Sequence, residues 1–329
     1  MKTIGTLLRK YRTALMGIAI LWVYLFHTSW NVFEPLYTII HKGYGGVDIF
    51  FFLSGFGLWY ALEKSSSLLD FYKRRLKKIY PSYLITLFAL FVLRYRSLRM
   101  EGYGKKELLF AFFSNVLGIS YFRWTVITFN WYIFAILIAY LLSPLFHEII
   151  KRRGGLFLLI LSLPLNVLFF GDFNHLIAST RLFLFLLGME TAYLAETKPD
   201  RKVSGALLLV LMGIGIVFLL TVSRLPAETL DYYGLWWYPF LLITPGLLYS
   251  LILLFEKIGK TSYPVLELFG KASLELYLLN VAFKDYVYAY VARFTGWNEW
   301  VWPIGLLIMG IAGLVFHFVL DKAQKILKG

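Results

Sequence analysis

Long apolar runs alternate with short polar segments along this chain, and this pattern predicts membrane-spanning helices. A span needs roughly 20 mostly apolar residues, because a helix of that length crosses the hydrocarbon core of a bilayer. Ten runs meet this description, at 13–31, 46–63, 79–97, 130–150, 155–171, 180–197, 204–222, 236–256, 272–292 and 298–320. We therefore predict an all-α polytopic membrane bundle of about ten transmembrane helices.

A further apolar stretch, 107–121, is short and contains Ser114 and Asn115. If this stretch does not span, six basic clusters fall on one side of the membrane: Lys2 with Arg9, Lys10 and Arg12; Lys73 to Lys78; Lys151 to Arg153; Lys198 with Arg201 and Lys202; Lys257 with Lys260 and Lys271; and Lys322 with Lys325 and Lys328. Lys and Arg concentrate in cytoplasmic segments. We therefore predict cytoplasmic termini and an interfacial or re-entrant 107–121. No linker divides the chain, which favours a single domain over 1–329.

Composition agrees with a membrane protein. The chain is 59% hydrophobic and 16% charged, whereas soluble domains are about half apolar and about a quarter charged. The formal charge of +14 does not indicate nucleic-acid binding, because the cations lie in short clusters between apolar runs. Cysteine is absent, which excludes disulfides, thiolate catalysis and cysteine metal sites. No cleavage site follows the first apolar run, so we expect it to be a retained helix rather than a signal peptide.

His27 ends the apolar run of the first predicted span. An ionisable group inside a span is costly, and it suggests a functional site. A neutral imidazole there would take a proton from a hydroxyl and return one to a leaving thiolate. A histidine hydrogen-bonded to headgroups or to a neighbouring helix is the competing interpretation.

Asp48 stands at the outward start of the second predicted span, among Gly45, Gly46, Ser54 and Gly55. Its carboxylate is a candidate partner that would orient His27, although a carboxylate at a helix start is also favoured by the helix dipole. The glycines and Ser54 favour close packing of helices.

The run from Lys73 to Lys78 carries five cations over six residues, just before the third predicted span. Arginine and lysine side chains of this density suit a phosphorylated donor such as coenzyme A. A topology anchor that touches anionic lipids is the alternative.

Other polar residues also fall inside predicted spans. Arg181 is a candidate partner for a carboxylate or for an acceptor sugar, Glu190 lies further along the same span, and Glu275 fits ordinary first-turn helix chemistry. The chain has no nucleotide-binding glycine loop, no His-Glu-x-x-His pair and no Gly-x-Ser-x-Gly elbow. These absences argue against ATP-driven pumps, common zinc proteases and standard serine hydrolases.

Three motifs in order resemble the membrane-bound acyltransferase-3 family: 17–27 with its terminal His27, 46–56 with Asp48, and 74–81, which runs from Arg74 to Pro81. Weaker matches follow at Trp131 with Tyr140 and Pro144, at 185–189 and at 270–279. The resemblance covers nearly the whole chain, and its specificity lies in 17–81.

The resemblance implies ten transmembrane helices, an acyl-CoA donor used from the cytoplasm and an extracytoplasmic acceptor hydroxyl on a polysaccharide or glycolipid. It places His27 as the catalytic base and Arg74, Arg75 and Lys78 in the donor-binding motif. It further implies O-acetylation of a cell-surface glycan, a bacterial plasma-membrane location, and neither a metal nor a nucleic-acid partner.

The chain departs from the family pattern at the position eleven residues before the histidine, which is Met16 where the family has arginine. Arg12 lies one turn earlier and is the candidate replacement in the donor site. The family also often has a histidine at the position of Asn280. A transporter or flippase of an acyl or glycan substrate is the runner-up, and a catalytically inactive scaffold is the third hypothesis.

Overall fold

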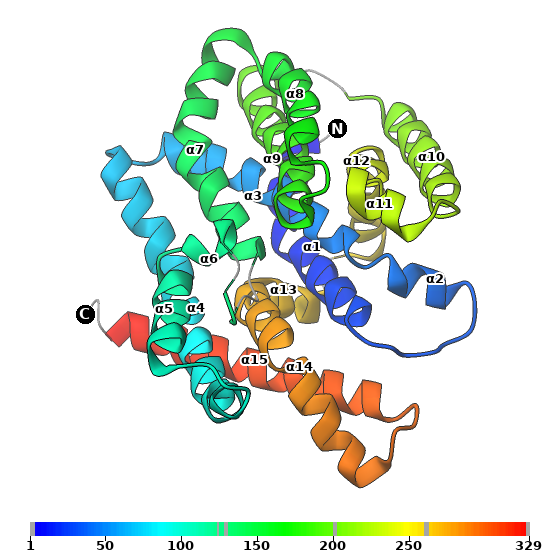
Figure 1. Ribbon diagram of the computed structural model, residues 1–329. Helices are drawn as coiled ribbons and strands as arrows, with labels where there is room; N and C mark the ends of the chain where they lie inside the picture. Colours follow the sequence, from blue (N-terminus) through cyan, green and yellow to red (C-terminus); the bar gives the residue numbers. More distant parts are fainter. Residues whose placement is uncertain (1–3, 124, 128–130, 200–202, 260–262, 327–329) are drawn as a thin grey trace. The chain divides into compact units, whose positions relative to one another are not determined.

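The computed structural model describes residues 4–123, 125–127, 131–199, 203–259 and 263–326, and these are 83% helical with no strand. Its elements are the following (Figure 1): α1 Ile4–Phe26, α2 Leu36–His41, α3 Gly45–Glu63, α4 Leu68–Met100, α5 Lys105–Val116, α6 Ile119–Phe122, α7 Trp131–Arg153, α8 Leu156–Ser162, the 3-10 helix η1 Pro164–Phe169, α9 Phe173–Thr197, α10 Gly205–Val222, α11 Ala227–Tyr233, α12 Tyr238–Ile258, α13 Pro264–Lys271, α14 Ser273–Thr295 and α15 Val301–Ile326. The predicted all-α membrane bundle is confirmed.

Within the described residues, seven helices are long and apolar enough to cross a membrane: α3, α4, α7, α9, α10, α12 and α15. Each overlaps one of the ten predicted spans, although α4 and α9 begin well before the predicted starts at 79 and 180. The predicted number of ten and the cytoplasmic termini remain predictions. Of the basic residues used to orient the spans, Lys2, Arg201, Lys202, Lys260 and Lys328 lie outside the described residues.

Three predicted spans are absent from this set of seven, for physical reasons. Helix α1 has only 23 residues and ends at Phe26. Every 18-residue stretch within it therefore includes the three cations Arg9, Lys10 and Arg12. Helix α14 carries Glu275, Lys284, Asp285 and Arg293. The predicted span 155–171 is two short pieces, because α8 ends before a proline and η1 continues as a 3-10 helix.

The segment 107–121 forms no helix of spanning length. It contains most of α5, which has 12 residues, and part of the short α6. Gly118 stands between them with φ +79°, a left-handed conformation that glycine adopts without steric cost. The prediction that this segment is not a simple span agrees with the structure, and its depth in a membrane remains a prediction.

The chain divides into two compact units. Unit 1 comprises Met1–Ala19, Tyr44–Tyr72 and Ala135–Gly270, and unit 2 comprises Ile20–Gly43, Lys73–Phe134 and Lys271–Gly329. The single-domain interpretation remains a prediction. The two units are described separately below.

Close backbone contacts hold unit 1 together. Helices α3 and α9 pack along one another, and a side chain at Gly55 would meet the Phe185 carbonyl while one at Gly188 would meet the Phe52 carbonyl. Small residues at such crossings let membrane helices approach closely. The predicted packing role is therefore confirmed for Gly55. Helices α10 and α12 form a second pair in the same unit (Figure 1).

Unit 2 is built around α14, which packs along α15 (orange and red in Figure 1). An apolar cluster joins α14 to α4 and α5, and its buried members are Leu90, Leu98, Leu108, Ile127 and Ala282. The hydroxyl of Tyr24 in α1 donates to the Leu276 carbonyl in α14 at 2.9 Å. The second half of α1 therefore packs on α14, and this contact positions the candidate site.

Candidate functional site

His27 follows the last residue of α1 and is partly buried in unit 2. Its Nδ1 atom lies 2.9 Å from the Val23 carbonyl oxygen, one helical turn back. A carbonyl oxygen only accepts hydrogen bonds, so Nδ1 carries the proton and Nε2 is the unprotonated nitrogen. In the neutral imidazole, the backbone therefore favours the tautomer whose Nε2 can accept a proton.

The surroundings of His27 come from the segment after α1 and from α14. The Trp22 indole donates to the Ile39 carbonyl at 2.8 Å, and a side chain at Gly43 would meet the Trp22 carbonyl. These contacts fasten α2 and Gly43 beside the end of α1. The charged side chains of Lys284 and Asp285 in α14 are close enough to interact electrostatically with the imidazole.

The basic run lies on α4 in unit 2. Arg74 and Lys78 are exposed, Arg75 is partly buried, and the chain becomes buried at Ile79. Residues three and four apart share a helix face, so Arg74 and Lys78 form part of one exposed basic face. Such a face can bind phosphate oxygens through charge-assisted hydrogen bonds.

Glu275 of α14 joins three helices of unit 2, and it meets α4 at Ser82, one turn beyond Lys78. Ser82 in α4 donates to Glu275 Oε1 at 2.6 Å, and His317 Nδ1 in α15 lies 3.0 Å from Glu275 Oε2. Ser82 is 1% exposed and Glu275 is 6% exposed. This carboxylate therefore fixes α4 next to its basic face, which is more than the first-turn helix chemistry that the sequence suggested. A histidine inside the last apolar run was the signal that sequence reasoning missed.

Asp48 belongs to unit 1, and the structure gives it a partner from α9. Arg181 Nη2 lies 3.2 Å from Asp48 Oδ2, and both side chains are 0% exposed. Arg181 also donates to the Ile177 carbonyl at 2.8 Å. Of the two partners that the sequence suggested for Arg181, a carboxylate or an acceptor sugar, the structure shows a carboxylate. The pairing of Asp48 with His27 remains a prediction, since the two residues belong to different units.

Arg12 also belongs to unit 1. Its Nε donates to the Leu53 carbonyl at 3.0 Å, and its guanidinium lies against Gly57 of α3. This contact fastens α1 to α3. A donor-binding role for Arg12 remains a prediction.

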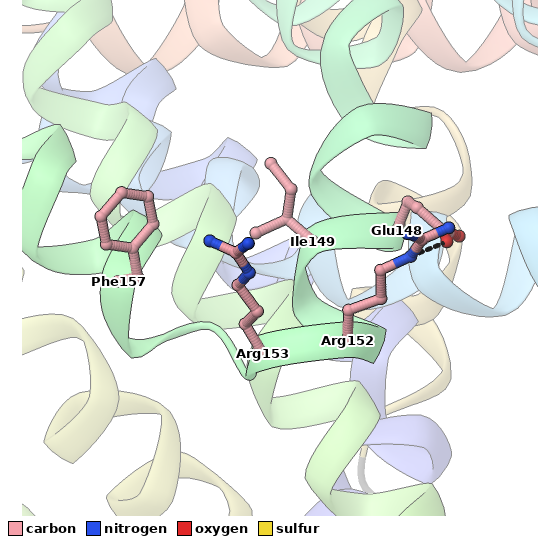
Figure 2. A pocket seen from close by; sticks show the side chains of 5 residues that line it. All are labelled: Glu148, Ile149, Arg152, Arg153 and Phe157. Carbon is pink, nitrogen blue, oxygen red and sulfur yellow. Dashed lines mark hydrogen bonds and ion pairs between the residues drawn. The ribbon is translucent and has the colours of Figure 1, made fainter.

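Two hollows of unit 1 contain none of the residues predicted for the site. A basic hollow of about 340 Å³ lies at the end of α7 and is lined by Glu148, Ile149, Arg152, Arg153 and Phe157. Figure 2 shows Arg153 and Phe157 on separate parts of its wall, while Arg152 Nε is joined to Glu148 Oε1 at 2.5 Å. The second hollow is an apolar cavity of about 580 Å³.

Among the described residues, no group of three His, Cys, Asp or Glu side chains lies close enough to hold a metal ion. The residues predicted for the site fall into two groups, one in each unit. His27, Arg74, Arg75 and Lys78 share unit 2, whereas Arg12 and Asp48 share unit 1.

Comparison with known proteins agrees with the motifs. The family model described as an acyltransferase domain, of the acyltransferase-3 type, matches residues 13–321. A protein of Acidianus two-tailed virus, named "Putative acetyltransferase ORF330", is 32% identical over 164 residues, which cover 48% of this chain and 46% of the viral protein. The matched region thus spans about half the length of this relative. No solved structure matches the chain. The chain belongs to the acyltransferase-3 family of membrane proteins.

Proposed function

We propose that this protein is a membrane O-acyltransferase that moves an acyl group, most simply acetyl, from cytoplasmic acyl-CoA to a hydroxyl of an extracytoplasmic polysaccharide or glycolipid. The observation that carries the proposal is the hydrogen bond between His27 Nδ1 and the Val23 carbonyl. It leaves Nε2 as a proton acceptor beside the end of an apolar helix. Membership of an acyltransferase family supports the same chemistry.

The proposed reaction needs one group that first takes and then gives a proton. His27 Nε2 takes the proton of the acceptor hydroxyl while the hydroxyl oxygen attacks the thioester carbonyl carbon. A carbon–oxygen bond forms, the carbon–sulfur bond breaks, and the electron pair leaves on the thiolate of CoA. The imidazolium then returns its proton to that thiolate, so the base is regenerated.

The donor is proposed to bind at the exposed basic face of α4 through Arg74, Arg75 and Lys78. Helix α14 gives a scale for the distance between the basic face of α4 and His27. Glu275 at one point of α14 contacts α4, and Lys284 further along has its charge close enough to influence the imidazole of His27. Nine residues separate these two positions, a rise of about 14 Å along a helix. This separation supports a donor whose phosphates stay at α4 while its long thiol arm extends toward His27.

The experiment that tests the proposal follows free CoA released from acetyl-CoA by the purified protein with a panel of glycan acceptors, corrected for acceptor-independent hydrolysis. We expect acceptor-dependent release that is lost in His27→Ala and kept in His175→Ala. His175 is a suitable control because its ring is paired with Asp172 at 2.6 Å outside the proposed site.

Full turnover by a folded His27→Ala variant would refute the assignment of the base. Movement of a glycan across proteoliposomes without CoA release, by wild-type protein, would replace the enzyme with the transporter alternative.

A further inference from the structure

The apolar cavity of about 580 Å³ belongs to unit 1 and is open along part of its surface. It is lined mainly by α9, α10 and α12, with residues of α1 and α3 completing the wall. Four of its lining residues carry polar side-chain atoms: Glu190, Thr191, Tyr238 and Tyr249. Glu190 Oε2 accepts from the Gly155 amide at 2.7 Å, and Thr191 Oγ1 donates to the Leu187 carbonyl at 2.7 Å. The remaining wall is aliphatic or aromatic.

Three fillings are possible for such a space, and two of them are unfavourable. If the cavity stayed empty, its apolar wall would lack packing partners and would lose the dispersion contacts that they provide. Water needs about two to four polar partners for each molecule, and apolar cavities accordingly stay dry. Since the wall has only four polar groups, and those of Glu190 and Thr191 are already bonded, water finds few partners here. Hydrocarbon is the filling that remains.

The dimensions of the cavity suit a long aliphatic chain. Its lining on α12 extends from Tyr238 to Ile252, and these 14 steps correspond to a rise of about 21 Å. One leaflet contributes about half of a hydrocarbon core that is about 30 Å thick. The volume is also several times that of the cavity of about 150 Å³ that binds benzene in another protein. The space is therefore long enough and large enough for a lipid tail.

The surroundings supply such a chain. Helices α9, α10 and α12 are all long and apolar enough to span a membrane. Helix α10 exposes Val210, Val217 and Leu220 at 58%, 64% and 55%, so one of its faces contacts the bilayer while another lines the cavity. We propose that this cavity is a binding site for an acyl chain of a membrane phospholipid. The site is independent of the acyl-transfer reaction proposed above.

The test uses the full-length protein purified in mild detergent and washed with excess detergent, with bound lipid identified by native mass spectrometry. Leu211→Trp would fill the cavity from α10. Leu220→Trp is the matched control, because it places the same side chain on the lipid-facing side of the same helix. Leu211→Phe is a smaller change that serves if the tryptophan variant does not fold.

We expect wild type and Leu220→Trp to retain a phospholipid that is lost from Leu211→Trp. Adding a long-chain phospholipid to delipidated wild type should raise its thermal unfolding midpoint, whereas dihexanoyl phospholipid should not, and Leu211→Trp should lose this response. Equal retention by all variants, no retention by wild type, or retention of an isoprenoid lipid instead would each overturn the proposal.

Discussion

The buried pair of Asp48 and Arg181 leads to a prediction about stability. In Asp48→Ala the guanidinium keeps its bond to the Ile177 carbonyl at 2.8 Å, but it loses its counter-charge at a site that is 0% exposed. Removing one partner of a buried ion pair costs about 3–5 kcal/mol. Replacing both partners with apolar residues of similar size is often neutral or stabilising. We therefore expect a loss of this size for Asp48→Ala and a recovery in the double variant Asp48→Leu with Arg181→Met.

The assay is the free energy of unfolding in mixed micelles, measured for the two single variants and the double variant as a cycle. Arg152→Ala is the control, because it breaks an exposed helix pair with Glu148, which is worth about 0.3–0.5 kcal/mol. A loss for Asp48→Ala no larger than that of the control would refute the reasoning. Turnover separates the two roles of Asp48: a structural pair predicts activity in the double variant, whereas a carboxylate that orients His27 predicts its loss.

Three further changes test other parts of the structure. Arg74→Ala with Arg75→Ala should raise the KM for acyl-CoA about tenfold or more, since hydrogen bonds to charged groups contribute about 1.5–3 kcal/mol each; the same change in the two arginines at the end of α7 (Figure 2) should leave KM unchanged. Asn280→Leu should leave stability unchanged or raise it by about 1–3 kcal/mol, because both amide atoms are buried with no partner among the described residues; a loss of stability would contradict this. Gly55→Ala should destabilise, because its new Cβ would lie 1.9 Å from the Phe185 carbonyl oxygen, whereas Gly213→Ala has open space and serves as the control.

The apolar pattern of the sequence predicted most of the helices, because the bilayer imposes both a length and a polarity on each span. The pattern was less informative where a run contained a helix breaker or several charges. Pro164 follows the end of α8 and begins η1, and the charged residues of α14 place that helix outside the span criterion. The helical class of the fold followed from the sequence, whereas the number of spans remains a prediction.

The candidate site was only partly accessible from sequence. His27 stood out because a histidine is rare at the end of an apolar run, and its motif was recognisable. The partners of the other polar residues depend on which helices meet, which a single sequence does not encode locally. Thus the sequence suggested a carboxylate or an acceptor sugar as the partner of Arg181, and only the packing of α3 on α9 shows that Asp48 is its partner. Likewise, the sequence around Glu275 does not indicate that its carboxylate is hydrogen-bonded to Ser82 and His317.

The central claim is that His27 supports transfer of an acyl group to an acceptor hydroxyl. The most direct measurement uses proteoliposomes with isotope-labelled acetyl-CoA on one side of the membrane and a glycan acceptor on the other, and it follows the label into the acceptor. We predict labelled ester in the glycan with wild-type protein and none with His27→Ala of equal stability. Label that stays in the donor while the glycan crosses the membrane, or equal labelling by both proteins, would contradict the account.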